Sequence, residues 1–188
     1  AGAFASLTLE LVGSREESAL WNEYVARYHY LGFKPLPGAQ LRYLVRYQNE
    51  ELALASFSAS AWKIAARDRF IGWTAEQRQK NLQLVVNNSR FLILPWVQAK
   101  NLASHLLSQL CRRIAHDWHQ RYGYRPVLIE TFVQYGRFQG TCYKAANWIL
   151  VGQTDGRGKM DIHTRRSLPK KAIWLYPLVK NFRQILCS

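Results

Sequence analysis

The clearest pattern in the sequence is a helical repeat of apolar residues between positions 102 and 118. Five apolar side chains recur every four residues: Leu102, Leu106, Leu110, Ile114 and Trp118. Polar residues occupy the opposite face, as in an amphipathic helix that packs on a core. Gly123 follows and is a typical helix stop. The pattern predicts a long helix that ends near residue 123.

Two further helices begin with capping boxes, in which a hydroxyl side chain and a Glu or Gln three residues later bond each other's backbone. The first opens at Ser14 and predicts a helix to about residue 28. The second opens at Thr74 and predicts a helix through the mid-80s, which the Asn pair at 87–88 ends. We also expect short helices within residues 61–73 and 140–147.

Alternation of apolar and polar residues predicts a strand at residues 40–48. A turn at 49–51 and an apolar partner at 52–58 complete a hairpin. Four more strand-length runs follow, at residues 90–95, 126–133, 148–153 and 172–176. Helices alternate with these strands, so we expect an α/β (α+β) fold with a mixed central sheet flanked by helices. The glycine motifs of nucleotide-binding folds are absent from the sequence.

Length and composition fit one folded domain. The chain has 188 residues, 48% hydrophobic and 20% charged, which is enough to bury a core and too apolar for a disordered chain. We expect a single domain over residues 1–188, with its core at 90–153 and a basic segment at 154–188. No apolar run is long enough to span a bilayer, so we expect no membrane partner. Three widely spaced cysteines predict no disulfide framework and fit a cytoplasmic setting.

The charge balance predicts a phosphate-bearing partner. Lys and Arg number 26 against 12 Asp and Glu, a formal net charge of +14 that attracts nucleic acid or a phosphorylated cofactor. Basic residues interleaved with aromatics near the C-terminus are the candidate nucleic-acid contacts: Arg157, Lys159, Arg165, Arg166, Lys170 and Lys171. A second basic group comprises Arg67, Arg69, Arg78 and Lys80. The alternative is a solvated basic surface that binds no polyanion.

Glu130 is the most unusual ionisable residue, because it interrupts an apolar strand. A carboxylate there must be paired, exposed or functional. It is a candidate general base that deprotonates an amine, or a structural partner of an arginine. His116 and His119 lie three apart on the polar face of the long helix, but no third ligand is evident, so we expect no metal site. Cys142 lacks a neighbouring base and is expected in the core.

Residues 90–153 resemble the core of the GCN5-related N-acetyltransferase (GNAT) superfamily. That family's loop motif, Gln/Arg-x-x-Gly-x-Gly/Ala, is similar to residues 98–103, with Asn101 in place of the central Gly. Its Tyr-x-x-x-Gly-Phe motif is similar to residues 143–148, with Asn147 in place of Gly. Among residues with a side chain, Asn best tolerates a left-handed backbone, so we expect both turns to survive.

This resemblance implies a GNAT-like sheet, an acyl donor and a catalytic tyrosine. The donor, acetyl-CoA or another acyl donor, would lie on the loop that opens the long helix: Gln98, Ala99, Lys100, Asn101, Leu102 and Ala103. A helix N-terminus suits its pyrophosphate. Tyr143 would be the general acid that protonates the leaving thiolate, because a phenol with a pKa near ~10 holds its proton. The alternatives are an ordinary strand-to-helix connection and a packed aromatic.

Further runs resemble the bacterial DruA-like family over nearly the whole chain: residues 28–32, 66–73, 87–91, 130–133 and 140–143. That family occurs near transposases and in Druantia anti-phage systems, so the resemblance implies nucleic acid and defence or transposition proteins as partners. Residues 140–148 are also similar to phage Mom-like enzymes that modify adenine in DNA. We expect a GNAT-like transferase acting on or near nucleic acid. The alternatives are a catalytically degenerate nucleic-acid-binding accessory and a small-molecule N-acyltransferase.

Overall fold

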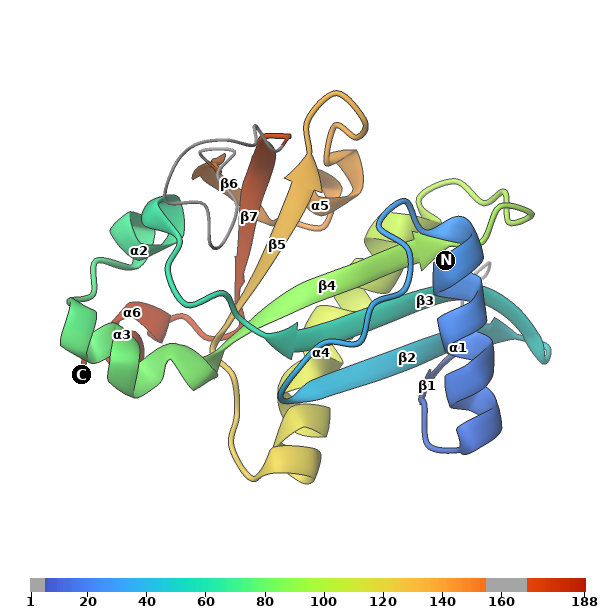
Figure 1. Ribbon diagram of the computed structural model, residues 1–188, viewed down its shortest axis with the longest axis horizontal. Helices are drawn as coiled ribbons and strands as arrows, with labels where there is room; N and C mark the ends of the chain where they lie inside the picture. Colours follow the sequence, from blue (N-terminus) through green and yellow to red (C-terminus); the bar gives the residue numbers. More distant parts are fainter. Residues whose placement is uncertain (1–5, 155–168) are drawn as a thin grey trace. The chain divides into compact units, whose positions relative to one another are not determined.

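The computed structural model describes residues 6–154 and 169–188 (Figure 1). Its contacts divide the chain into two compact units. Unit 1 contains Ala1–Ala59 and Asn88–Leu102, and unit 2 contains Ser60–Asn87 and Ala103–Ser188. In the described residues, no helix is both long enough and apolar enough to cross a membrane.

Unit 1 combines one helix with antiparallel strands. Its elements are β1 (Leu7–Leu11), α1 (Arg15–Tyr28), β2 (Gln40–Tyr47), β3 (Glu50–Ala59) and the later part of β4 (Val85–Ile93). β2 pairs with both β1 and β3. The β2–β3 hairpin turns at Gln48 and Asn49, which both have a positive φ, as a tight two-residue turn requires. The turn predicted at 49–51 therefore begins one residue too late and ends two residues too late.

Helix α1 begins at the predicted capping box. Ser14 Oγ accepts from Glu17 N at 3.0 Å, and Glu17 Oε2 accepts from Ser14 N at 3.2 Å. The inner face of α1 packs on the strands of unit 1 through a buried cluster: Trp21, Val25, Leu44, Leu54 and Leu94. The indole N–H of Trp21 is satisfied by Tyr43 O at 3.2 Å. This packing buries one face of α1 and leaves the opposite face exposed to solvent.

Unit 2 holds most of the helices and a group of antiparallel strands. Its helices are α2 (Ala65–Ile71), α3 (Ala75–Asn81), the 3₁₀ turn η1 (Leu82–Leu84), α4 (Leu102–Tyr122), α5 (Thr141–Ala145) and α6 (Phe182–Leu186). Its strands are the start of β4, β5 (Leu128–Gln134), β6 (Ile149–Gln153) and β7 (Lys171–Pro177). The first residue of α4, Leu102, is assigned to unit 1. β7 lies between β5 and β6 and runs antiparallel to both.

The strands follow the order β1-β2-β3-β4-β5-β7-β6. The first three residues of β4, Val85–Asn87, pair in parallel with Leu128–Glu130 of β5. The rest of β4 belongs to unit 1. Parallel and antiparallel pairs thus occur in one sheet, and the predicted α/β fold with a mixed sheet flanked by helices is confirmed.

The long helix α4 also agrees with its prediction. Leu106, Leu110 and Ile114 are fully buried, as the four-residue spacing requires. Gly123 follows the helix with a φ of +81°, and its N–H donates to His119 O at 2.8 Å. A residue that reaches this conformation without strain ends the helix here.

The region between α3 and β4 differs from its prediction. α3 starts at the predicted Thr74 cap but ends at Asn81, and β4 begins at Val85. The Asn pair therefore lies inside a strand, where Asn88 Nδ2 donates to Ser56 O at 3.0 Å. This side-chain bond satisfies a buried amide, which explains why a residue typical of turns fits a strand. The pattern also missed two five-residue elements, β1 and α6.

Candidate functional site

The loop after β4 leads directly into α4. Val97 N donates to Leu94 O at 3.0 Å and Leu102 N to Ala99 O at 3.3 Å, so the loop consists of two short turns. Four of its residues are exposed: Gln98, Ala99, Lys100 and Asn101. Leu102 is buried and Ala103 is half-buried at the start of α4. Four of the six residues expected to contact a cofactor are thus open to solvent.

Asn101 and Asn147 adopt the left-handed backbone that the sequence predicts. φ is 63° at Asn101 and 64° at Asn147. Asn101 is the last residue before α4, and Asn147 lies between α5 and β6, where its N–H donates to Lys144 O at 3.1 Å. Asn adopts this conformation at lower cost than other residues with a Cβ. Both turns therefore keep the shape that a glycine would give.

The start of α4 suits an anionic group. The helix has 21 residues, and its first turn contains no acidic residue. The first amides of a helix have no acceptor within the helix and lie at the positive end of its dipole. Lys100 adds a positive charge just before them. Amides and lysine together can hold a phosphate or pyrophosphate.

Tyr143 lies on α5 and is only 8% exposed. Its ring meets that of Trp148 edge-on, with centroids 5.0 Å apart, and its carbonyl accepts from Trp148 N at 3.0 Å. Gly140 precedes α5 with a φ of 70°, and a Cβ there would come within 2.9 Å of Trp174. This packing holds the tyrosine in one place, which a structural aromatic and a proton donor both need.

Glu130 is fully buried and pairs with Arg67, which is fully buried as well. Its Oε2 accepts from Arg67 Nη1 at 2.8 Å, and its Oε1 accepts from Ala61 N at 3.0 Å. Burial raises the pKa of Glu130, while Arg67 and the Ala61 amide act in the opposite direction. A general base must reach the proton that it removes, yet protein groups occupy both oxygens. The geometry favours a structural role for Glu130 over the base role.

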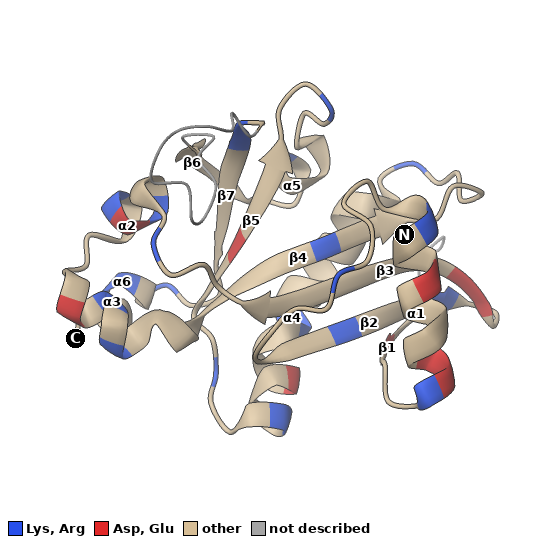
Figure 2. Cartoon of the chain, viewed as in Figure 1, with Lys and Arg blue, Asp and Glu red and all other residues tan. Residues whose placement is uncertain are grey.

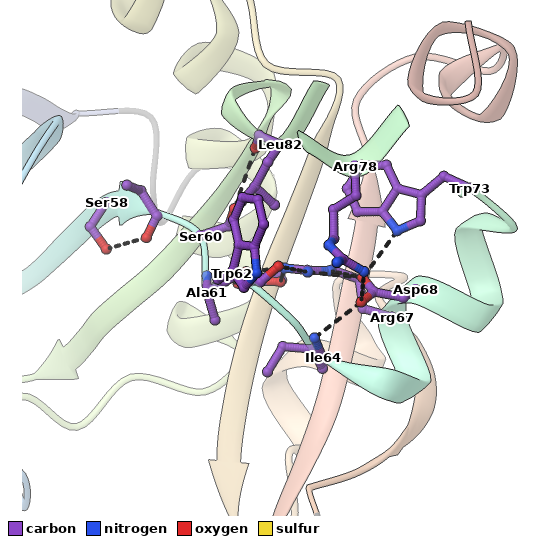
Figure 3. Close-up of polar contacts among 12 residues, drawn as sticks. Ser58, Ser60, Ala61, Trp62, Ile64, Arg67, Asp68, Trp73, Arg78 and Leu82 are labelled. Carbon is purple, nitrogen blue, oxygen red and sulfur yellow. Dashed lines mark hydrogen bonds and ion pairs between the residues drawn. The ribbon is translucent and has the colours of Figure 1, made fainter. Parts of the chain in front are cut away.

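Asp68 links this pair to a second arginine (Figure 3). Its Oδ1 accepts from Arg67 at 2.9 Å and from Trp73 Nε1 at 3.1 Å, and its Oδ2 pairs with Arg78 Nη1 at 3.4 Å. Arg78 also lies over the exposed ring of Trp62, 5.3 Å from its centroid. We call Arg67, Asp68, Arg78 and Glu130 the buried charge network.

The buried charge network corrects one expectation from the sequence. Arg67 and Arg78 were grouped with basic residues suited to phosphate, but their charges are matched inside the protein. Arg69 and Lys80, the other members of that group, are exposed. One signal in the sequence pointed to the network: a carboxylate in an apolar strand needs a cation, although nothing in the sequence said which arginine supplies it.

The C-terminal basic candidates are described only in part. Lys170 is exposed, and Lys171 is half-buried at the start of β7, where its N–H donates to Thr154 Oγ1 at 3.0 Å. Four candidates lie outside the described residues: Arg157, Lys159, Arg165 and Arg166. Figure 2 shows that basic residues also occur on strands and helices of both units.

The structure does not support a nucleophilic role for Cys111 or Cys142. Burial raises the pKa of Cys142, and it raises that of Cys111 to about 12. Both thiols therefore stay protonated and are poor nucleophiles. His116 and His119 are exposed on α4. Within residues 6–154 and 169–188, no three His, Cys, Asp or Glu side chains gather as a metal site would need.

Comparison with solved structures identifies the fold. A chimera of the Vibrio cholerae spermidine N-acetyltransferase SpeG and hSSAT matches with a TM-score of 0.59 and 12% identity, over 93% of this chain and 96% of that chain. The ribosomal-protein-S18-alanine N-acetyltransferase of Escherichia coli matches with a TM-score of 0.56 and 10% identity, over 92% and 94%. The aminoglycoside acetyltransferase AAC(6')-Ib, in complex with coenzyme A and kanamycin, matches with a TM-score of 0.55 and 14% identity, over 92% and 95%. At these identities the likeness shows the fold alone, which is that of GNAT acetyltransferases.

Comparison of the sequence gives a family match. A family model described as Druantia protein DruA matches residues 1–167. A search of curated proteins found no match.

Proposed function

The chain belongs to the DruA family, and we propose that it is a GNAT-type acyltransferase that acts on or near nucleic acid in a phage-defence or mobile-element setting. One observation carries the transferase part: in a chain of GNAT fold, an exposed loop at residues 98–101 enters α4 through a left-handed Asn101. The name of the family supports the defence setting. The net charge of +14 supports a nucleic-acid partner.

The loop and the start of α4 fit the anionic part of an acyl-CoA. The donor set there consists of backbone amides and Lys100, with no carboxylate in the first helical turn to repel a pyrophosphate. When bound, an acyl-CoA supplies an acyl group activated as a thioester. On this chain the amides would bind the pyrophosphate, and Lys100 would balance part of its charge.

Tyr143 is the side chain that we assign to proton donation. A phenol hydroxyl carries a proton that it can give to a thiolate. The edge-on contact with Trp148 keeps its ring in place. Phe would preserve this contact and remove only the hydroxyl, so the Tyr143→Phe variant separates the chemistry from the packing.

Thermal unfolding with and without acetyl-CoA tests the proposal. A ligand at ~100 times its Kd stabilises a protein by about 2.7 kcal/mol, which shifts the Tm visibly. We expect wild type and Tyr143→Phe to be stabilised, Lys100→Gln to be stabilised less, and only Tyr143→Phe to lose transfer while it retains binding. Lys63→Gln is the matched control, because it also removes one exposed lysine. If acetyl-CoA gives wild type no shift, the acyl-CoA proposal fails.

A second candidate function is a nucleic-acid-binding accessory that has lost transfer activity. Two observations favour it: Asn101 has a side chain where the GNAT loop motif has a glycine, and Glu130 is engaged by Arg67. This function predicts that nucleic acid, and not acetyl-CoA, raises the Tm. It also predicts that Tyr143→Phe changes nothing that can be measured in binding.

A further inference from the structure

A small pocket lies within unit 1, where α1 and the loop after it meet strands β2, β3 and β4. Its volume is about 100 Å³, and its lining includes Trp21, residues 33–36, Arg42, Ser56 and Arg90. A water occupies roughly 30 Å³ in the liquid, and pockets for whole small molecules measure roughly 300 Å³ or more. The pocket therefore has room for one small chemical group.

Arg42 reaches this pocket from β2 and is held by neutral groups of α1. Its Nη1 donates to Asn22 Oδ1 and its Nη2 to Ser18 Oγ, each at 2.9 Å. Its guanidinium lies over the Trp21 ring, 5.5 Å from the centroid. Burial lowers the pKa of Arg42, but an arginine in a protein keeps its proton. A full positive charge is thus held at the pocket, and no carboxylate of residues 6–154 or 169–188 forms an ion pair with it.

Arg90 reaches the same pocket from β4 and is also held by neutral acceptors. Its Nη1 donates to Ser89 O at 2.7 Å and its Nε to Gly32 O at 3.4 Å. Burial lowers its pKa as well. Two partly desolvated guanidinium groups therefore line one pocket, and the exposed Lys34 lines it too.

Other enclosed arginines of this protein have carboxylate partners. Arg46, on the same strand as Arg42, pairs with Glu10 and Glu51, and the buried Arg67 pairs with Glu130. In the two ranges that the structure describes, no Asp or Glu lies within ion-pair distance of Arg42 or Arg90. Desolvating a charge without an opposite charge is costly. An anion in the pocket would remove that cost.

We propose that this pocket binds an oxyanion, a phosphate or carboxylate group, between Arg42 and Arg90. A guanidinium presents several N–H donors in one plane, which match the paired oxygens of such groups. The small volume admits a terminal group whose remaining atoms extend into solvent. The site shares no residue with the acyl-CoA loop, and it stands whether or not the chain transfers an acyl group.

Inorganic phosphate is the first probe, added at constant ionic strength against chloride. We expect a saturable rise in Tm and saturable broadening of the phosphorus NMR signal. Arg42→Gln and Arg90→Gln should each weaken phosphate at least tenfold. Arg27→Gln is the matched control, because it removes one charge from the exposed side of α1, where Arg27 pairs with Glu23. Absence of a saturable effect in wild type, or equal loss in Arg27→Gln, overturns the proposal.

Two further variants keep the result clear. Lys100→Gln should retain the phosphate binding that Arg42→Gln and Arg90→Gln weaken. If Lys100→Gln weakens phosphate as much as those two variants do, the anion lies at the start of α4 and the proposal is overturned. Arg90→Lys keeps the charge without the planar donors, so it should bind phosphate more weakly than wild type and more tightly than Arg90→Gln. Binding is measured by NMR on the folded fraction, so lower stability of a variant does not hide the answer.

The source of the oxyanion is tested with matched ligands. A short single-stranded oligonucleotide with a 5′-phosphate is compared with the same oligonucleotide ending in a 5′-hydroxyl, and acetate represents a carboxylate. A preference of tenfold or more for the 5′-phosphate that disappears in Arg90→Gln supports the pocket and a nucleic-acid source. Binding of phosphate or acetate without that preference supports the pocket and a small-molecule source. If none of the ligands binds, the proposal is wrong.

Discussion

The Arg67–Glu130 pair shows how single residues stabilise unit 2. Removing two charges from water costs several kcal/mol per ion, which is recovered only when each partner's hydrogen bonds are completed. Arg67 also donates to Ala61 O at 2.8 Å and contacts Asp68, and Glu130 accepts from Ala61 N. Each charge is therefore satisfied. Loss of Arg67 would leave Glu130 buried without its cation, and loss of Glu130 would leave Arg67 with Asp68, which it shares with Arg78.

Glu130→Gln should lower the free energy of unfolding by about 3 kcal/mol, because the neutral amide no longer balances Arg67. Urea unfolding measures the loss. Replacing both residues by apolar ones, Arg67→Met with Glu130→Leu, should cost less than the sum of the single changes. A Glu130→Gln variant as stable as wild type but without transfer activity would instead restore the base role.

The two left-handed asparagines give a second prediction for single residues. Asn101→Val and Asn147→Val should each destabilise the protein by about 1–2 kcal/mol, because a β-branched side chain is strained at a φ above 60°. Asn101→Gly should remain close to wild type in stability and tighten acetyl-CoA, since the backbone can approach a phosphate more closely. Asn147→Gly is the control and should leave acetyl-CoA affinity unchanged; equal tightening in both variants would contradict the assignment of the loop.

At the scale of helices and strands, local signals explain what could be predicted. α1, α3 and α4 were located because their caps, stop residue and apolar spacing lie within a few residues of one another. The boundary between α3 and β4 was missed because the Asn88 side chain bonds to Ser56, 32 residues away. β1 was missed because it has five residues and its strand character depends on pairing with β2.

The capping box of α1 allows the contribution of one local signal to stability to be measured. Ser14→Ala should cost about 1 kcal/mol in urea unfolding, because it removes the acceptor for Glu17 N. The amides of Gly13 and Ser14 hold the pKa of Glu17 below its ordinary value of 4.5. The folded state thus favours the charged carboxylate, so this contribution is present above pH 4.5 and is lost as the pH falls through the lowered pKa.

Glu17→Gln isolates this pH dependence from that of the other carboxyl groups. The stability difference between wild type and Glu17→Gln should be largest at neutral pH and shrink in acid. Glu16→Gln is the control, because Glu16 lies in the same first turn and is not part of the capping box. A constant difference across the titration would show that the Glu17 contacts contribute no charge-dependent stability.

For the whole molecule, motifs located the candidate site better than they assigned its chemistry. The 98–103 loop and Tyr143 are candidates because two short runs resemble GNAT motifs, and the left-handed asparagines confirm the shape of both turns. The role of Glu130 depends on an arginine 63 residues away, a contact that only the folded chain makes. Net charge has a similar limitation: the value of +14 already subtracts the carboxylates, but it does not say which basic residues are exposed and which, like Arg67 and Arg78, pair with carboxylates.

The remaining basic residues should make nucleic-acid binding depend strongly on salt. The logarithm of the binding constant should fall linearly with the logarithm of salt concentration, with a slope of about one unit per phosphate contact. Replacing Arg165 and Arg166 by Ala should reduce the slope by about two units. Replacing the exposed Arg121 and Arg125 removes the same charge elsewhere and should weaken binding only slightly.

Fluorescence anisotropy with labelled single- and double-stranded oligonucleotides measures the binding constant and its dependence on salt. Affinity that does not change with salt would show that the positive charge does not contact phosphate, and the nucleic-acid part of the proposed function would then be wrong.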